Sequence, residues 1–150
     1  MKGMAELIRT HAFVQGLPDD TIALIAGCAR NMVFQANDYL GREGSAADAF
    51  YLVRHGTVAL EIFEPGRGPF SFRTVKEHEI LGADWLMPPY RWSFDARAVT
   101  LTRTIAFDAK CLRDKCEADH HVGYEMMKRF IPPLIKGLQS ARLQSLDVAR

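Results

Sequence analysis

The sequence predicts an α+β fold that is mainly β: a jelly-roll-like β-roll flanked by N-terminal helices and by a long C-terminal helix. Three observations lead to this class. Hydrophobic residues follow helical spacing near both ends of the chain but alternate in its middle. The middle contains many short, β-branched segments separated by glycine, as in sandwiches and barrels. At 150 residues, the chain is long enough for one domain, 1–150, with a single core.

The N-terminal region, residues 1–31, is expected to form a helical lead-in. Its sequence reads as two helices separated by a glycine–proline break at residues 16–18. In the second of these helices, Ile22, Ile25 and Cys28 recur at a spacing close to one helical turn. We therefore expect this helix to bury one face.

The central region, residues 32–108, is expected to form the β-roll. Turn residues bound its apolar segments, and residues 54–56 read as a short hairpin turn, with residues 64–69 as a second, longer hairpin loop. The segments themselves are rich in β-branched and aromatic residues. The predicted strands lie within MVFQ (32–35), FYLVRHGTVALEIFE (50–64), FSFRTVKE (70–77) and ARAVTLTRTIAFD (96–108).

The C-terminal region, residues 109–150, returns to helical spacing, with a short helix over 109–118 and a long one over 120–146. The long helix carries an apolar stripe at spacings of 4, 3, 4 and 3, formed by Met127, Ile131, Leu134, Leu138 and Ala141. This stripe predicts a homodimer, and the alternative is that it packs on its own barrel. Because proline removes a helical hydrogen bond, Pro132-Pro133 predicts a kink near Phe130 or a break into two helices.

Composition limits the classes of function. A formal net charge of +1 argues against a long basic surface for nucleic acid. No apolar run reaches the roughly 18 residues of a membrane span, and the N-terminus does not resemble a signal peptide. The cysteines Cys28, Cys111 and Cys116 are odd in number and lack metal spacing. We therefore expect free thiols in a reducing cytoplasm.

The segment from Ile80 to Asp108 carries the candidate site. It reads as a strand end, a glycine turn, a helical turn, a loop and an alternating strand, which is how a small β-barrel builds a phosphate-binding cassette. The candidate ligand-binding residues are Gly82, Ala83, Asp84, Trp85, Arg91, Trp92 and Ser93.

The order of these pieces resembles the cyclic-nucleotide-binding domain of the Crp/Fnr regulators. The segment VFQANDYLGREGSAADAFYLVRHGTVALEI matches the opening of that family's barrel in the placement of Leu40, Glu43, Gly44, Tyr51, Val53, Gly56 and Val58. LGADWL lies where the cassette begins, and the terminal LQSLDVAR resembles the hinge that precedes a helix-turn-helix domain. The resemblance implies a β-roll, a dimerising C-terminal helix and ligand-driven movement of that helix. Since no helix-turn-helix segment is present, we do not expect direct DNA binding by this chain.

The cassette departs from the family at the two positions that hold the nucleotide. In nucleotide-binding members a glutamate follows the glycine and bonds the ribose hydroxyl, whereas Ala83 follows Gly82 here. Those members also use an arginine followed by Ser or Thr to hold the cyclic phosphate. Here Trp92 falls at the arginine position, Ser93 keeps the hydroxyl, and Arg91 is one residue early. On an extended segment, that shift directs a side chain to the opposite face.

Three interpretations of the cassette follow. In the first, Arg91, Ser93 and the amides after Gly82 form a working phosphate site. In the second, an aromatic plug fills the pocket while Arg91 is solvated outside, the plug being Trp85, Tyr90, Trp92 and Phe94. In the third, the aromatic faces hold a different ligand together with Asp84 or Asp95.

We therefore predict a non-enzymatic sensor module of the Crp/Fnr effector type, with a remodelled pocket not selective for cyclic AMP and with no resident cofactor or metal. The alternatives are a working cyclic-nucleotide receptor that uses Arg91 and Ser93, and a scaffold that docks a partner protein. A haem or metal sensor through Cys116 and His120 is the weakest alternative, since the chain has no cysteine cluster. Motifs of nucleotide hydrolases, serine esterases and zinc proteases are missing from the sequence.

Overall fold

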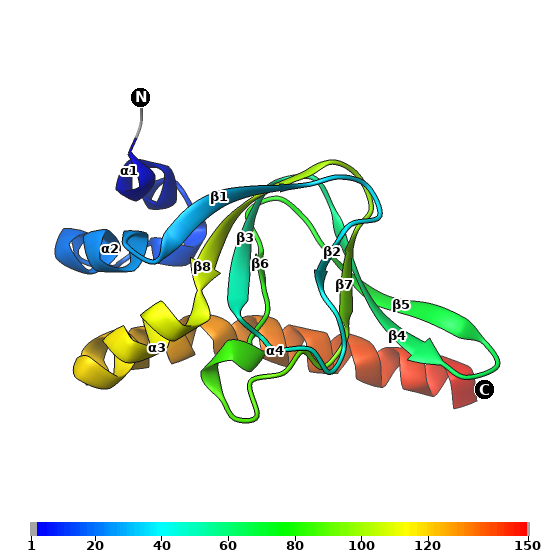
Figure 1. Cartoon of the computed structure of the whole chain (residues 1–150). Helices are drawn as coiled ribbons and strands as arrows, with labels where there is room; N and C mark the ends of the chain where they lie inside the picture. The colour runs from blue at the N-terminus through cyan, green and yellow to red at the C-terminus, as the bar shows by residue number, and fades with distance from the viewer. Residues whose placement is uncertain (1–2, 150) are drawn as a thin grey trace.

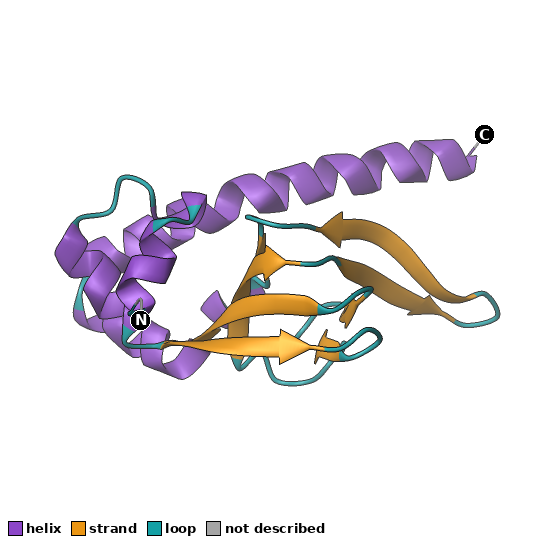
Figure 2. Ribbon diagram, turned by 90° about the horizontal axis from the view of Figure 1, so that it is seen from above, coloured by secondary structure: helices purple, strands orange, loops and turns teal. Residues whose placement is uncertain are grey.

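The computed structural model describes the backbone of residues 3–149 and the side chains of residues 3–140. Two four-stranded antiparallel sheets face each other and form a β-roll, with short helices at one end and a long helix along one side (Figures 1 and 2). The first sheet has the strand order β1-β8-β3-β6 and the second has the order β2-β7-β4-β5. The predicted α+β fold is confirmed. The strands are β1 (Ala29–Phe34), β2 (Tyr39–Gly41), β3 (Ala49–His55), β4 (Val58–Glu64), β5 (Gly68–Val75), β6 (Ile80–Leu81), β7 (Asp95–Ala98) and β8 (Thr102–Asp108).

Two predicted connections differ in the structure because the chain crosses between the sheets. Residues 54–56 do not form a hairpin, since β3 and β4 belong to different sheets and the chain passes between them at Gly56. Gly56 has φ +101°, and a Cβ there would lie 2.6 Å from the Leu101 carbonyl oxygen, so only glycine fits. Likewise, the predicted strand 96–108 is divided into β7 and β8. The hairpin at residues 64–69 does join paired strands, β4 and β5.

Helices occupy both ends of the chain. The N-terminal lead-in contains α1 (Met4–Arg9), a 3-10 turn η1 (Ala12–Val14) and α2 (Asp19–Ala26). After the roll come α3 (Ala109–Ala118) and α4 (His120–Ala149). Helix α3 begins where Asp108 accepts a hydrogen bond from the Cys111 amide at 2.8 Å, as expected of an N-cap aspartate.

Helix α4 runs through Pro132 and Pro133 as one helix, so the predicted break into two helices is wrong. Proline's fixed φ is itself helical, and the penalty is the missing N–H donors. Packing on the preceding turns offsets this penalty, because Val122, Met126 and Phe130 are buried. The helix therefore continues along the side of the roll as a single rod (Figure 2).

An aromatic cluster joins the roll to the helices. Phe50 of β3 stacks on Phe107 of β8 with ring centroids 4.6 Å apart, and on Trp85 at 4.9 Å. Phe130 of α4 meets the edge of Phe50 at 4.9 Å. Since Trp85 is fully buried in this cluster, it belongs to the protein core and anchors the helical turn of the cassette.

A disulfide joins Cys28 and Cys111, so the prediction of free thiols is wrong for these two residues. Only Cys116 is free in the described part of the chain. Antiparallel pairing of β1 with β8 places Ala29 opposite Phe107, which brings the residue before β1 close to the first turn of α3. The sequence separation of 83 residues hides this proximity. Within residues 3–149, no helix is both long and apolar enough to cross a membrane.

Candidate ligand-binding site

The cassette has the predicted layout. Strand β6 ends at Leu81, Gly82 turns the chain with φ +98°, and a 3-10 turn η2 follows at Asp84–Leu86 before the loop to β7. Ser93 donates to Asp84 twice, from Oγ to Oδ1 at 2.9 Å and from its amide to Oδ2 at 3.3 Å. The two ends of the loop are thereby tied together, and the Asp84 carboxylate is already partnered.

A cavity of about 340 Å³ lies between the cassette and α4. One wall comes from the roll and the other from the helix, so the cavity is mostly apolar, as ligand pockets usually are. The polar side chains among its described lining residues are those of Arg73, Asp84 and Ser93. The lining includes Leu60, Phe72, Arg73, Val75, Leu81, Gly82, Ala83, Asp84, Ser93, Phe94, Phe130, Leu134 and Leu138.

Four of the seven predicted cassette residues line this cavity: Gly82, Ala83, Asp84 and Ser93. Arg91 does not. Its Nη1 donates to the Gly44 carbonyl oxygen at 2.8 Å, and its backbone pairs with Ala46. The guanidinium is thus engaged with the loop after β2, on the outside of the roll.

Trp92 is buried inside the roll, 4% exposed, between two glycines. A Cβ on Gly41 would lie 2.2 Å from the Trp92 ring, and one on Gly82 would lie 3.0 Å from it. Phe94 meets the ring edge with centroids 5.9 Å apart. Trp92 therefore fills the interior where the family resemblance places an arginine, in the manner of the predicted plug.

Tyr90 of the predicted aromatic plug and Asp95 of the predicted alternative ligand site lie outside the cavity. Tyr90 stacks under the Arg113 guanidinium, whose Cζ lies 4.2 Å from the ring centroid, and does not line the cavity. Asp95 accepts a hydrogen bond from the Glu43 amide at 2.8 Å and pairs with Arg42. Asp95 therefore closes the β2 loop and has no access to the cavity.

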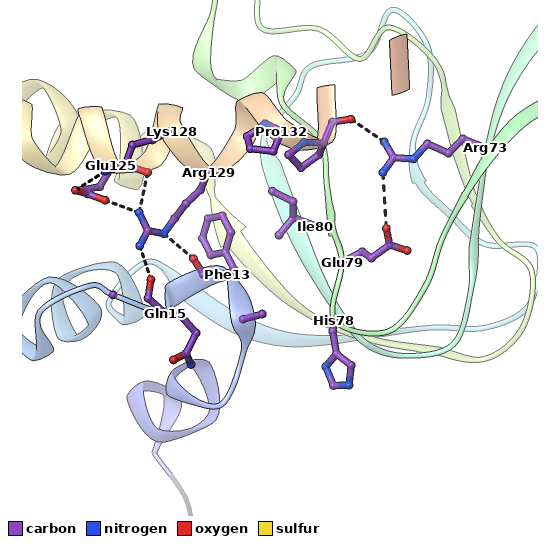
Figure 3. Close-up of a pocket in the computed structure, with 13 residues that line it drawn as sticks. Phe13, Gln15, Arg73, His78, Glu79, Ile80, Glu125, Lys128, Arg129 and Pro132 are labelled. Carbon is purple, nitrogen blue, oxygen red and sulfur yellow. Dashed lines mark hydrogen bonds and ion pairs between the residues drawn. The ribbon is translucent and has the colours of Figure 1, made fainter. Parts of the chain in front are cut away.

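Sequence reasoning missed Arg73, which projects from β5 toward α4. Its Nη1 donates to the Pro133 carbonyl oxygen at 3.3 Å, and its Nη2 lies 3.7 Å from Glu79 Oε2 (Figure 3). In the sequence, Arg73 stands in a strand with no clean alternation, so nothing marks it as facing inward.

A second cavity, of about 680 Å³, lies next to the first, and Arg73 borders both. It is bounded by the η1 turn, the β5–β6 connection and the middle of α4 (Figure 3). At its edge, Arg129 donates to the carbonyl oxygens of Phe13 and Gln15 at 2.6 and 2.7 Å. Arg129 also bonds Glu125 and so holds the pKa of that carboxyl below its ordinary value. This contact fastens α4 to the N-terminal lead-in.

The predicted dimer stripe is largely exposed on α4. Met127, Ile131, Leu134 and Leu138 are 48, 51, 56 and 71% exposed. Ile135, which the predicted spacing left out, is also 52% exposed. The side chain of Ala141 and those of the hinge-like LQSLDVAR lie outside the described residues.

The histidines and Cys116 provide no metal centre in the described part of the chain, where no three His, Cys, Asp or Glu side chains gather closely enough to bind an ion. Burial raises the pKa of the Cys116 thiol, which disfavours the thiolate that a metal needs.

Comparison with known proteins places this geometry in a family. Residues 31–119, which span the seven strands from β2 to β8 and helix α3, match the family model of the cyclic nucleotide-binding domain. The sequence matches no curated protein. Among solved structures, a protein assigned as cyclic nucleotide-binding from Geobacter metallireducens GS-15 is 25% identical, with a TM-score of 0.79 over 92% of this chain and 99% of that one.

Two further structures extend the comparison. A cyclic nucleotide-binding-like protein from Brucella abortus is 25% identical, with a TM-score of 0.61 over 77% of this chain and 99% of that one. The catabolite activator protein of Thermus thermophilus shares the fold at 19% identity, with a TM-score of 0.70 over 89% of this chain and 62% of that one. With a family match over more than half of its length and the β-roll, cassette and long C-terminal helix in place, the chain belongs to the cyclic nucleotide-binding domain family.

Proposed function

We propose that this chain is a non-catalytic small-molecule sensor of the Crp/Fnr effector type, whose pocket has been remodelled away from cyclic AMP. One observation carries the proposal: Trp92 fills the interior between Gly41 and Gly82. The family resemblance places the phosphate-binding arginine at this position. An indole ring offers a single N–H donor and no charge, so it does not replace a guanidinium.

The remaining polar groups also fit a cyclic nucleotide poorly. Ala83 has no carboxylate for a ribose hydroxyl. The Ser93 hydroxyl is bonded to Asp84, whose carboxylate would repel a phosphate in the same cavity. Arg91 is engaged with the Gly44 carbonyl and does not line the cavity. These contacts favour an apolar ligand or one that binds another part of the cavity.

A titration with cyclic AMP and cyclic GMP tests this proposal. A nucleotide at 100 times its Kd stabilises a fold by ~2.7 kcal/mol, which raises Tm by several degrees. We expect no shift in Tm and no heat by calorimetry at millimolar nucleotide. A clear shift in Tm, together with a loss of ~1.5–3 kcal/mol in nucleotide binding free energy on Arg91→Ala, would establish the alternative receptor that uses Arg91 and Ser93.

We further propose that the chain forms a homodimer through α4. The support is the stripe of Met127, Ile131, Leu134 and Leu138, each about half exposed or more on one long helix. A solvated row of large apolar side chains is unfavourable, and a second copy of the same helix is complementary to it. A partner protein on this stripe, the scaffold alternative, would use the same surface.

A further inference from the structure

Among the residues whose side chains the structure describes, Arg73 is the only cation that lines the cavity beneath α4. Its side chain is 17% exposed, so burial has removed most of its contact with water. A buried guanidinium needs partners for its donors, because an unmade hydrogen bond to a charged group is costly. The partners of Arg73 therefore indicate whether the side chain is structural.

Other arginines of similar burial are well paired. Arg97 donates to both oxygens of Glu61, at 3.0 and 3.2 Å, and to Asn37 Oδ1 at 2.9 Å. Arg129 bonds two carbonyls and a carboxylate. Arg73 has one long bond to a neutral carbonyl, at 3.3 Å, and one ion pair at 3.7 Å without a hydrogen bond. The Arg73 guanidinium therefore has N–H donors that the surrounding protein does not fully use.

The cavity around this guanidinium is aromatic and aliphatic. Phe72 and Phe94 meet edge to face with ring centroids 5.7 Å apart, and Leu134 and Leu138 of α4 also line the cavity. The Asp84 carboxylate on the cassette side opposes a ligand of high negative charge. A flat apolar body with one negative group fits both the walls and the Arg73 guanidinium.

We propose that the cavity beneath α4 binds a small aromatic monocarboxylate, with Arg73 as its anchor. A carboxylate accepts two parallel N–H bonds from a guanidinium fork, which gives the carboxylate both affinity and orientation. The aromatic body would lie between the phenyl rings and α4. This inference rests on the proposed sensor function and names the class of ligand for that cavity.

Two isosteric probes, 2-naphthoate and 2-naphthamide, test the anchor, since they differ in charge but hardly in shape. We expect the purified chain to bind 2-naphthoate about tenfold or more tightly than 2-naphthamide in a fluorescence titration. The variant Arg73→Gln should remove this preference while changing the 2-naphthamide affinity less than about twofold, because only the charge-assisted bonds are lost.

Controls separate the anchor from general charge and from folding. Arg67→Gln removes the same charge from the exposed β4–β5 hairpin and should keep the preference. Arg73→Lys keeps the charge without the fork and should retain part of the preference, which covers the case in which Arg73→Gln does not fold. Equal affinities of the two probes for the wild type, or a preference that survives Arg73→Gln, would overturn the anchor and leave the cavity as a ligand site. Failure of both probes to bind the wild type would overturn the sensor cavity itself.

Discussion

At the scale of single residues, Trp92 and Gly41 depend on each other sterically, because the ring leaves no room for a side chain at position 41. The indole ring lies where a side chain on residue 41 would have to be. The absence of a Cβ at Gly41 therefore lets strand β2 pass close to the Trp92 ring. Substitutions at either position should therefore reveal an energetic coupling between the two.

We expect Gly41→Ala to lower the free energy of unfolding by ~1–3 kcal/mol, since the new methyl group overlaps the ring. Trp92→Ala should lower it by ~3–5 kcal/mol through the cavity left behind. In the double variant, Gly41→Ala should have little further effect, so the two changes are strongly non-additive. Urea denaturation measures all three.

The exposed Phe63 of β4 provides the control, because Phe63→Ala should change stability by only about 0.5 kcal/mol. If the costs of Gly41→Ala and Trp92→Ala simply add, the ring does not occupy the place described.

Two arginines differ in how far the sequence predicts their place. The one-residue offset of Arg91 predicted a side chain outside the pocket, because alternation on an extended segment is a local rule, and the structure has Arg91 bonded to Gly44. Arg73 was missed because its role depends on α4 passing over β5, a contact between residues 60 positions apart. Pairing at that distance leaves no local pattern.

At the scale of elements, α4 is fastened by hydrogen bonds just before its prolines and at them. Before them, Arg129 binds the helix to the N-terminal lead-in, and at Pro133 the carbonyl oxygen accepts from Arg73 of β5. Arg129 therefore adds hydrogen bonds to a docking of the lead-in that also rests on Phe13, whose ring meets Phe50 and Phe130.

We expect Arg129→Ala to lower the free energy of unfolding by ~1–3 kcal/mol, because the Phe13 and Gln15 carbonyls lose their donor. The pH dependence follows from Glu125, whose pKa is lower in the folded state than in the unfolded one. This contribution is present above the unfolded pKa of about 4.3 and is lost as the pH falls through the folded pKa. The difference between wild type and variant in urea denaturation should therefore shrink at acid pH.

Lys128→Ala is the matched comparison, since it removes a neighbouring cation that bonds Glu125 and lies over the Tyr124 ring, and it leaves the Arg129 bonds to the lead-in in place. A pH-independent difference for Arg129→Ala would mean that the carboxylate contributes nothing to the contact.

Elements also divide into those that local sequence determines and those that it does not. The bounds of α3 match the prediction, because Asp108 caps a run of helix-forming residues. The splitting of residues 96–108 between two sheets, and the continuity of α4 through its prolines, depend on packing from outside each segment. The disulfide likewise depends on the pairing of β1 with β8.

At the scale of the whole molecule, one helix serves both the cavity and the outer surface. Leu134 and Leu138 line the cavity, yet more than half of each side chain is exposed. A second copy packed on α4 would cover the same leucines that a ligand touches from the other side. Dimer formation and ligand binding would then share contacts, and each would change the affinity of the other.

We expect Leu138→Glu to convert a dimer into a monomer, because it places a charge within the apolar stripe. Multi-angle light scattering measures the change as a halving of mass. Ile131→Glu should do the same without altering the cavity lining, and Val33→Glu on the edge strand β1 should leave the dimer intact. A dimer that persists in both α4 variants uses another surface.

The disulfide has a mechanical consequence. Cys28 precedes β1 and Cys111 follows β8, so all eight strands lie within one closed covalent loop. Tension applied along the chain from both sides would pass from the lead-in through the two sulfur atoms into α3 and α4. The helices would extend under load, while the strands between the cysteines would carry none of it, so the cavity wall that the roll provides would keep its shape while the helix covering it was drawn away.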